Sequence, residues 1–168
     1  MSNRHILLVE DNPDDEALTI RAFQKSNVRN RVSVARDGAE ALQHLLAIES
    51  GDAPPPLLIL LDLKLPKVDG IEVLRRIRAG ERTRLIPVVV LTTSIEQEDV
   101  LAGYRGGANA YVRKPVNFAD FAEAVKTIGM FWLLLSEQPP DVSSPLRPSD
   151  APAATPMNPA SLDSGWHL

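Results

Sequence analysis

The sequence predicts an α/β fold built on a parallel sheet, and two observations lead to that prediction. Five short apolar runs are separated by segments with helical spacing, so strand and helix alternate along the chain. The runs are continuous rather than interrupted by polar residues, as expected for strands buried on both faces of a parallel sheet. Right-handed crossovers between such strands give a doubly wound (βα)5 sandwich. Five strands favour the flavodoxin-like order 2-1-3-4-5.

The apolar runs define the expected strands, which are Ile6–Val9, Val32–Ala35, Leu57–Leu61, Pro87–Leu91 and Ala110–Val112. The first helix is expected after Pro13, where acidic residues suit the positive end of a helix dipole. Asp69 can cap the third helix, which carries an apolar stripe at Ile71, Leu74 and Ile77. The fourth helix starts near Ile95 and ends at a glycine pair, and the last spans about 117–135.

Size and composition indicate one globular domain. The chain has 168 residues, of which 44% are hydrophobic and 24% charged. It contains no cysteine, which excludes disulfides and thiolate chemistry, and its three histidines show no metal-ligand spacing. A net charge of −4 gives no attraction for nucleic acid. We find neither a signal peptide nor an apolar stretch of membrane-spanning length, so we expect no membrane association and a cytoplasmic location.

The composition changes near residue 136 and divides the chain into an expected domain at 4–135 and a tail at 136–168. The tail holds seven of the 14 prolines, and it has one basic residue against four acidic ones. Such a segment cannot bury enough apolar surface to offset the entropy cost of ordering it. We therefore expect a Pro-, Ser- and Ala-rich tail or arm and no output domain.

Polar residues follow four of the expected strands. Glu10 and Asp11 stand at the end of the first expected strand, and Asp62 stands at the end of the third. Thr92 stands at the end of the fourth strand, and Lys114 follows the fifth. A doubly wound sheet brings these ends to one edge. Carboxylates gathered there repel each other unless a hard cation joins them, and Mg²⁺ takes oxygen ligands of this kind. A lysine and a hydroxyl can bind phosphoryl oxygens, so the whole set fits phosphoryl transfer.

Each of these residues also has a purely structural interpretation when it is taken alone. Asp11 could cap a helix, Thr92 could end a strand, and Lys114 could be an ordinary surface lysine. We favour the structural role, an acidic helix start, for three residues that follow in the same stretch, Asp14, Asp15 and Glu16. It is the joint occurrence at strand ends, in the order that one fold requires, that favours a functional site.

These motifs are similar to those of the receiver domain of two-component response regulators, the CheY-like family. The resemblance covers about 4–135, and the motifs that carry it are Leu8–Asp11, Leu61–Pro66, Asp69-Gly70, Leu91–Ser94, Gly107-Ala108 and Tyr111–Pro115. The residues of Val9–Asp15 and Leu61–Pro66, together with the expected lack of an output domain, resemble the single-domain regulators that partner bacterial phytochrome histidine kinases.

The resemblance implies that Asp62 accepts a phosphoryl group from a sensor histidine kinase, with a phytochrome kinase as the candidate, and that Mg²⁺ is the cofactor. The implied metal ligands are Asp11, Asp62 and the main-chain carbonyl of Lys64, with Glu10 acting through a metal-bound water. Glu10 stands where aspartate is commoner in the family. Such a protein is not an enzyme for another substrate, because it catalyses only its own phosphorylation and dephosphorylation.

Further roles follow from the same resemblance. Lys114 is expected to pair with the phosphoryl group, and its peptide bond to Pro115 to be cis. Thr92 is expected to move toward the phosphoryl group, and Tyr111 to turn inward with it. Lys64 and Ser94 occupy family positions that tune hydrolysis.

The end of the last helix is apolar around its circumference, where Phe131, Trp132, Leu134 and Leu135 stand. Such a helix is normally covered by another element. We favour a homodimer through this helix, with the two tails as arms that reach across the partner. A tail that folds back over its own chain is the alternative.

Three rival functions remain open at this point. A phosphohydrolase of the haloacid dehalogenase type would need Asp-x-Asp after the first strand, where this chain has Glu10-Asp11-Asn12. A nucleotide or flavin binder would need a Gly-rich phosphate loop there, and none follows the first strand. A receiver-like scaffold that is never phosphorylated would have no need of the intact acidic and basic set.

Overall fold

The computed structural model describes residues 4–94, 96–114 and 117–135, and they form the expected α/β sandwich. Five parallel strands lie in the order β2-β1-β3-β4-β5, which confirms the predicted fold class and topology. They are β1 (His5–Val9), β2 (Arg31–Ala35), β3 (Leu58–Leu61), β4 (Val88–Thr92) and β5 (Ala110–Arg113).

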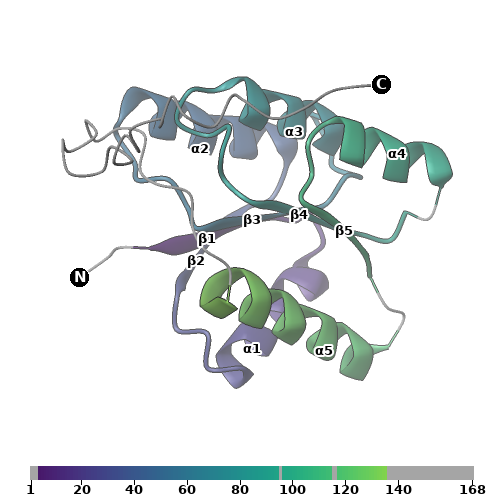
Figure 1. The fold of residues 1–168 in the computed structure, drawn as a ribbon. Coiled ribbons are helices and arrows are strands. Elements are labelled where there is room, and N and C mark those ends of the chain that lie inside the picture. Colours follow the sequence, from purple (N-terminus) through teal and green to yellow (C-terminus); the bar gives the residue numbers. More distant parts are fainter. Residues whose placement is uncertain (1–3, 95, 115–116, 136–168) are drawn as a thin grey trace, which may run out of the picture.

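The helices cover both faces of the sheet. They are α1 (Pro13–Lys25), α2 (Gly38–Ser50), α3 (Gly70–Ala79), α4 (Gln97–Arg105) and α5 (Phe118–Gly129), followed by the π-helical turn η1 (Met130–Leu135). In Figure 1, α1 and α5 lie on one face, and α2, α3 and α4 lie on the other. No helix in the described part of the chain has both the length and the apolar character needed to cross a membrane.

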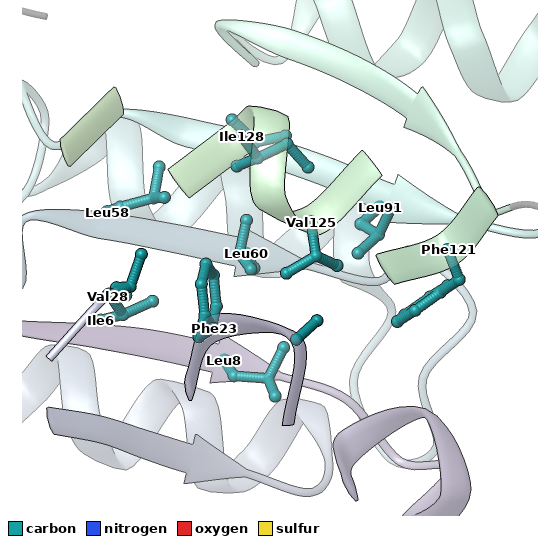
Figure 2. Close-up of a cluster of buried hydrophobic side chains, with 12 residues drawn as sticks. Ile6, Leu8, Phe23, Val28, Leu58, Leu60, Leu91, Phe121, Val125 and Ile128 are labelled. Atoms are coloured by element: carbon teal, nitrogen blue, oxygen red, sulfur yellow. The ribbon is translucent and has the colours of Figure 1, made fainter. Parts of the chain in front are cut away.

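The three central strands are buried on both faces, which explains their continuous apolar runs. Residues that point toward α1 and α5 pack with Phe23, Phe121 and Val125, and they include Ile6, Leu8, Leu58 and Leu60 (Figure 2). The alternate residues pack against α2 and α3, and they include Leu7, Val9, Ile59 and Leu61. The edge strands β2 and β5 are only half-buried, in keeping with their shorter apolar runs.

Polar caps set where two helices near the carboxyl edge of the sheet begin. The side chain of Asn12 accepts hydrogen bonds from the backbone of Asp14 and Asp15, and α1 starts at Pro13 as predicted. The side chain of Asp69 accepts from the backbone N–H of Ile71 at 2.8 Å, which is the predicted cap of α3. Both helices therefore begin at the end of a loop that follows a strand and carries acidic residues.

The connection from β3 to α3 depends on a close approach at Gly70. Its N–H donates to the carbonyl of Leu63 at 3.0 Å. A Cβ atom at this position would overlap the backbone of Asp62 and Leu63, so only glycine fits without a shift of the chain. This tight return holds the segment after Asp62 against the end of β3.

The last helix differs from the single helix predicted over 117–135. Its α-helical part ends at Gly129, which packs closely against Phe23 and Val28 of the α1 region, and η1 follows. Glycine is a weak helix former, and in an i→i+5 turn each residue rotates less around the helix axis than in an α-helical turn. As a result both Trp132 and Leu133 pack against the core beside Ile128.

Arg78 of α3 anchors the amino-terminal edge of the sheet. Its guanidinium donates to the carbonyls of Gly107, Arg84 and Ile86 at 2.7–2.9 Å, and to the side chain of Asn109 at 2.9 Å. Burial lowers its pKa from the ordinary value. One fork of donors thus satisfies backbone carbonyls in the loops before β4 and β5.

We expect Arg78→Met to lower the free energy of unfolding by about 3 kcal/mol, because several carbonyls lose a charged donor at once. Urea unfolding followed by circular dichroism measures this. Arg76→Met on the same helix is the control. It removes only an exposed pair with Glu72 and should cost about 0.5 kcal/mol or less. Equal losses in the two variants would contradict the anchoring role.

Candidate functional site

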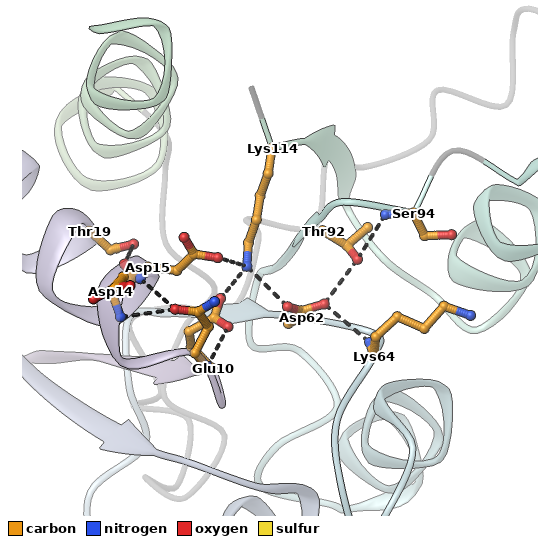
Figure 3. A network of polar contacts seen from close by, with 10 residues as sticks. Glu10, Asp14, Asp15, Thr19, Asp62, Lys64, Thr92, Ser94 and Lys114 are labelled. Carbon is orange, nitrogen blue, oxygen red and sulfur yellow. Dashed lines mark hydrogen bonds and ion pairs between the residues drawn. The ribbon is translucent and has the colours of Figure 1, made fainter. Parts of the chain in front are cut away.

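Backbone hydrogen bonds hold the polar residues at the carboxyl edge of the sheet. The N–H of Glu10 donates to Ala35 at 2.9 Å, that of Asp62 to Val9 at 3.0 Å, and that of Lys114 to Thr92 at 2.8 Å. The sheet ladder therefore continues one residue beyond each of these strands. Because their backbones are fixed in this way, the side chains of Glu10, Asp62 and Lys114 emerge close together, as Figure 3 shows.

The Asp62 carboxylate lies at the centre of the group and is only 7% exposed. Its Oδ1 atom accepts from the backbone N–H of Lys64 at 3.1 Å and from the Thr92 hydroxyl at 2.9 Å. Its Oδ2 atom accepts from Lys114 Nζ at 3.0 Å. Each oxygen is therefore oriented by a donor from another segment, and the carboxylate has a defined direction.

Lys114 is buried and contacts three carboxylates. Its Nζ atom donates to Glu10, to Asp15 at 2.8 Å and to Asp62 at 3.0 Å. Burial acts to lower the pKa of Lys114, but the hydrogen bonds to Asp15 and Glu10 and the negative charges of Asp62 and Glu10 outweigh it. The pKa is raised above its ordinary value, and the ammonium stays charged.

An acidic cluster lies beside this lysine. Oxygens of Glu10, Asp11 and Asp62 lie within 4.8 Å of one another. Burial raises the pKa of Glu10 to about 7, although Lys114 acts in the opposite direction. Asp11 is exposed at the mouth of the site. Close oxygen ligands that bear negative charge are what a hard divalent cation requires, so the donor set fits such an ion.

Thr92 connects Asp62 to helix α4. Besides donating to Asp62, its Oγ1 atom accepts from the backbone N–H of Ser94 at 3.3 Å. The Ser94 hydroxyl donates to the carboxylate of Asp99 in α4, and Lys64 Nζ lies 3.1 Å from the same carboxylate. The hydrogen bond from Ser94 and the ion pair with Lys64 lower the pKa of Asp99. Lys64 and Ser94, which stand two positions after Asp62 and Thr92, therefore share the Asp99 carboxylate of α4 as a partner.

Tyr111 of β5 joins the same group of contacts. Its hydroxyl donates to the carbonyl of Ser94 at 3.2 Å, and its half-buried ring lies 6.4 Å from that of Tyr104. Burial raises the pKa of the Tyr111 hydroxyl. The contact links the loop after β4 to β5, and the inward turn of Tyr111 stays a prediction.

The sequence analysis did not predict that Asp15 and Asp99 belong to this site. Asp15 lies in the first turn of α1, as expected of a helix-start acid, but its side chain also pairs with Lys114 across 99 positions. Asp99 gave no signal beyond being an acid near a helix start. Asp14 and Glu16 fit their structural interpretation, since Asp14 is exposed and Glu16 pairs with Arg36 at 2.8 Å.

Other predicted residues lie apart from this group or outside the described residues. Pro115 is outside them, so its expected cis bond stays a prediction. Phe131 is 52% exposed and stacks edge-on against Trp132, with ring centroids 5.0 Å apart. The side chains of Leu134 and Leu135 are also outside the described part.

Fold and site together have the features of a receiver domain, and residues 6–126 match the response regulator receiver domain family. This match covers well over half of the 168 residues, and the chain belongs to that family. The family is one of signalling proteins, which argues against the phosphohydrolase and the nucleotide binder.

Two relatives are similar over most of their own length. A probable methanogenesis regulatory protein, FilR2 of Methanothrix harundinacea, is 45% identical over 134 residues, 80% of this chain and 86% of that protein. The response regulator Rcp1 of Synechocystis is 43% identical over 129 residues, 76% of this chain and 88% of that protein.

Solved structures agree with these relatives. The crystal structure of Mn²⁺-bound Rcp1 has a TM-score of 0.76 at 40% identity and covers 82% of this chain and 99% of its own. The phosphorylated cyanobacterial phytochrome response regulator RcpA has a TM-score of 0.77 at 42% identity, with coverage of 82% and 99%. The chain is thus homologous to phytochrome response regulators.

Because the acidic cluster is self-repelling, Asp11→Asn is expected to stabilise the metal-free protein by about 1 kcal/mol. Unfolding by urea in the presence of a chelator measures this. Asp14→Asn removes an exposed acid of the first turn of α1 outside the cluster, and it should instead cost about 0.5 kcal/mol through the helix dipole. A loss of stability in Asp11→Asn would contradict the repulsion.

Proposed function

We propose that this chain is a single-domain response regulator of a two-component phosphorelay, in which Asp62 accepts a phosphoryl group from a kinase phosphohistidine. The observation that carries the proposal is the environment of the Asp62 carboxylate. Thr92 and Lys114 donate to its two oxygens at 2.9 and 3.0 Å, beside the acidic cluster. Membership of the receiver family supports the same role.

The chemistry follows from these positions. A carboxylate oxygen of Asp62 forms a bond to phosphorus while the bond from phosphorus to the histidine nitrogen breaks. The nitrogen keeps the electron pair of the broken bond and takes up a proton from solvent, so the products are an acyl phosphate and a neutral imidazole. Lys114 and Thr92 offer donors to the phosphoryl oxygens. Mg²⁺ would neutralise charge on these oxygens, held by Asp11, Asp62, the main-chain carbonyl of Lys64 and, through water, Glu10. Attack of water on phosphorus later restores the carboxylate, and no other substrate is acted on.

The proposed partner is a sensor histidine kinase of the phytochrome type. Support comes from Rcp1 and RcpA, the second of which is named as a phytochrome response regulator. FilR2, of similar identity, is instead named for methanogenesis. We propose a cytoplasmic location as well, because a histidine kinase takes its phosphoryl group from ATP, which is found in the cytoplasm.

We also propose that the chain signals through protein contacts. The expected tail at 136–168 lies outside the described residues, and its composition supports an arm. Thr92 and Tyr111 would carry the change at Asp62 to the surface formed by β4, α4 and β5.

Phosphoryl transfer to this chain should depend on Mg²⁺ and on Asp62. We expect labelling by a phytochrome histidine kinase, and by the small-molecule donor acetyl phosphate, which is independent of the choice of kinase. Asp62→Asn should lose all labelling, because an amide cannot form an acyl phosphate. Asp52→Asn, an exposed acid distant in sequence from the site, should be labelled like the wild type.

Mass spectrometry or phosphate-affinity gels report the result. Undiminished labelling of Asp62→Asn would refute the assignment of the phosphoacceptor. A wild-type chain that resists both donors in the presence of Mg²⁺ would favour the scaffold alternative.

A homodimer through the end of the last helix completes the proposal. In the described part, Met130 and Phe131 are 43% and 52% exposed, next to Trp132. Exposed apolar side chains on one helix suit a self-complementary interface with two-fold symmetry. Leu134, Leu135 and the tail arms would extend this interface.

Solution mass tests the dimer. Light scattering should give twice the chain mass for the full protein, and a lower mass after deletion of the residues that follow Ser136 or in Phe131→Ser. Leu46→Ser, which alters a more exposed leucine on α2, should leave the mass unchanged. A monomer both before and after the deletion would refute the dimer.

A further inference from the structure

Among the described residues, Asp15 is the one carboxylate in contact with Lys114 that belongs neither to the acidic cluster nor to the phosphoacceptor. Its Oδ2 atom lies 2.8 Å from Lys114 Nζ, slightly closer than Asp62 at 3.0 Å. Its side chain is 26% exposed, and that of Lys114 is 4% exposed. The charge of Asp15 is therefore available to the lysine from the solvent side of the site.

The local structure of α1 fixes this contact. The N–H of Asp15 donates to the Asn12 side chain at 3.2 Å, and its carbonyl accepts from the Thr19 hydroxyl at 2.7 Å. Asn12 is itself tied to Glu10, whose Oε1 atom accepts from its N–H at 3.1 Å. Asp15 is thus held at a set distance from the end of β1, and Figure 3 shows its carboxylate turned toward Lys114.

The number of donors on Lys114 makes this contact important. A lysine ammonium has three N–H groups, and here three carboxylates accept them. Two of the three take part in the proposed reaction, because Asp62 would become an acyl phosphate and Glu10 lies in the acidic cluster that fits a cation. Asp15 has no part in that reaction, so its charge and its contact with Lys114 are available throughout.

We propose that Asp15 is a positioning residue that holds the Lys114 ammonium beside the phosphoryl group when Asp62 and Glu10 no longer do so. This inference rests on the proposed function of Asp62. A lysine side chain has four flexible carbons, and an unanchored ammonium would lose orientation and hydrogen bonding at the phosphoryl oxygens. The role is indirect, since Asp15 acts only through Lys114.

Binding of beryllofluoride, a stable analogue of the phosphoryl group on aspartate, tests the inference in the full-length chain. The Mg²⁺ affinity of each variant is measured first, and the analogue is titrated at saturating Mg²⁺ by calorimetry. Asp15→Asn should weaken binding of the analogue roughly tenfold, the usual effect of one charge-assisted hydrogen bond. Asp14→Asn makes the same charge change in the same helical turn without touching Lys114, and it should stay within about twofold.

A double-mutant cycle separates positioning from a general effect on α1. In a Lys114→Ala background, Asp15→Asn should have no further effect on binding of the analogue, because its only route of action is gone. Equal losses in Asp15→Asn and Asp14→Asn, or a loss that persists without Lys114, would overturn the role of Asp15 and leave Asp62 as the acceptor. A wild-type chain that fails to bind the analogue would overturn both.

Discussion

The site depends on one interaction, the contact between the buried ammonium of Lys114 and carboxylates from three different elements. Glu10, Lys114 and Asp62 are 2%, 6% and 7% exposed, and buried charges of one sign are strongly destabilising when they lack a partner. Lys114 provides that partner. Burial raises the pKa of Glu10 to about 7 in spite of Lys114. The backbone bond from Lys114 to Thr92 places this cation, so the geometry of β5 sets the electrostatics of β1 and β3.

The two oxygens of the Asp62 carboxylate connect to two different parts of the molecule. Through Lys114, Oδ2 is linked to Asp15 and the start of α1. Through Thr92, Oδ1 is linked to Ser94 and on to Asp99 of α4. A covalent change at this single carboxylate would have to rearrange donors on both sides. A site of this kind can pass a local chemical event to surfaces on opposite faces of the sheet.

Much of the fold and of the site could be predicted because both depend on local patterns along the chain. Continuous apolar runs identified the strands, and a parallel sheet necessarily brings their carboxyl ends to one edge. Glu10, Asp62, Thr92 and Lys114 were found for that reason. Asp15 and Asp99 were not, since an acid in the first turn of a helix is common for dipole reasons alone, and nothing in its neighbours in sequence shows which way the side chain points.

The sequence by itself determined which segments form strands, how they are ordered and which functional groups end them, because period and turn chemistry are local properties. Only the tertiary structure decided which charged side chains form ion pairs with one another. The contact between Asp15 and Lys114 joins residues 99 positions apart, and its length depends on where the fold places the start of α1 relative to the end of β5. Likewise, α5 changes to η1 at the point where Gly129 packs closely on Phe23 and Val28. Packing distances of this kind are set by the whole fold, and no short pattern of residues encodes them.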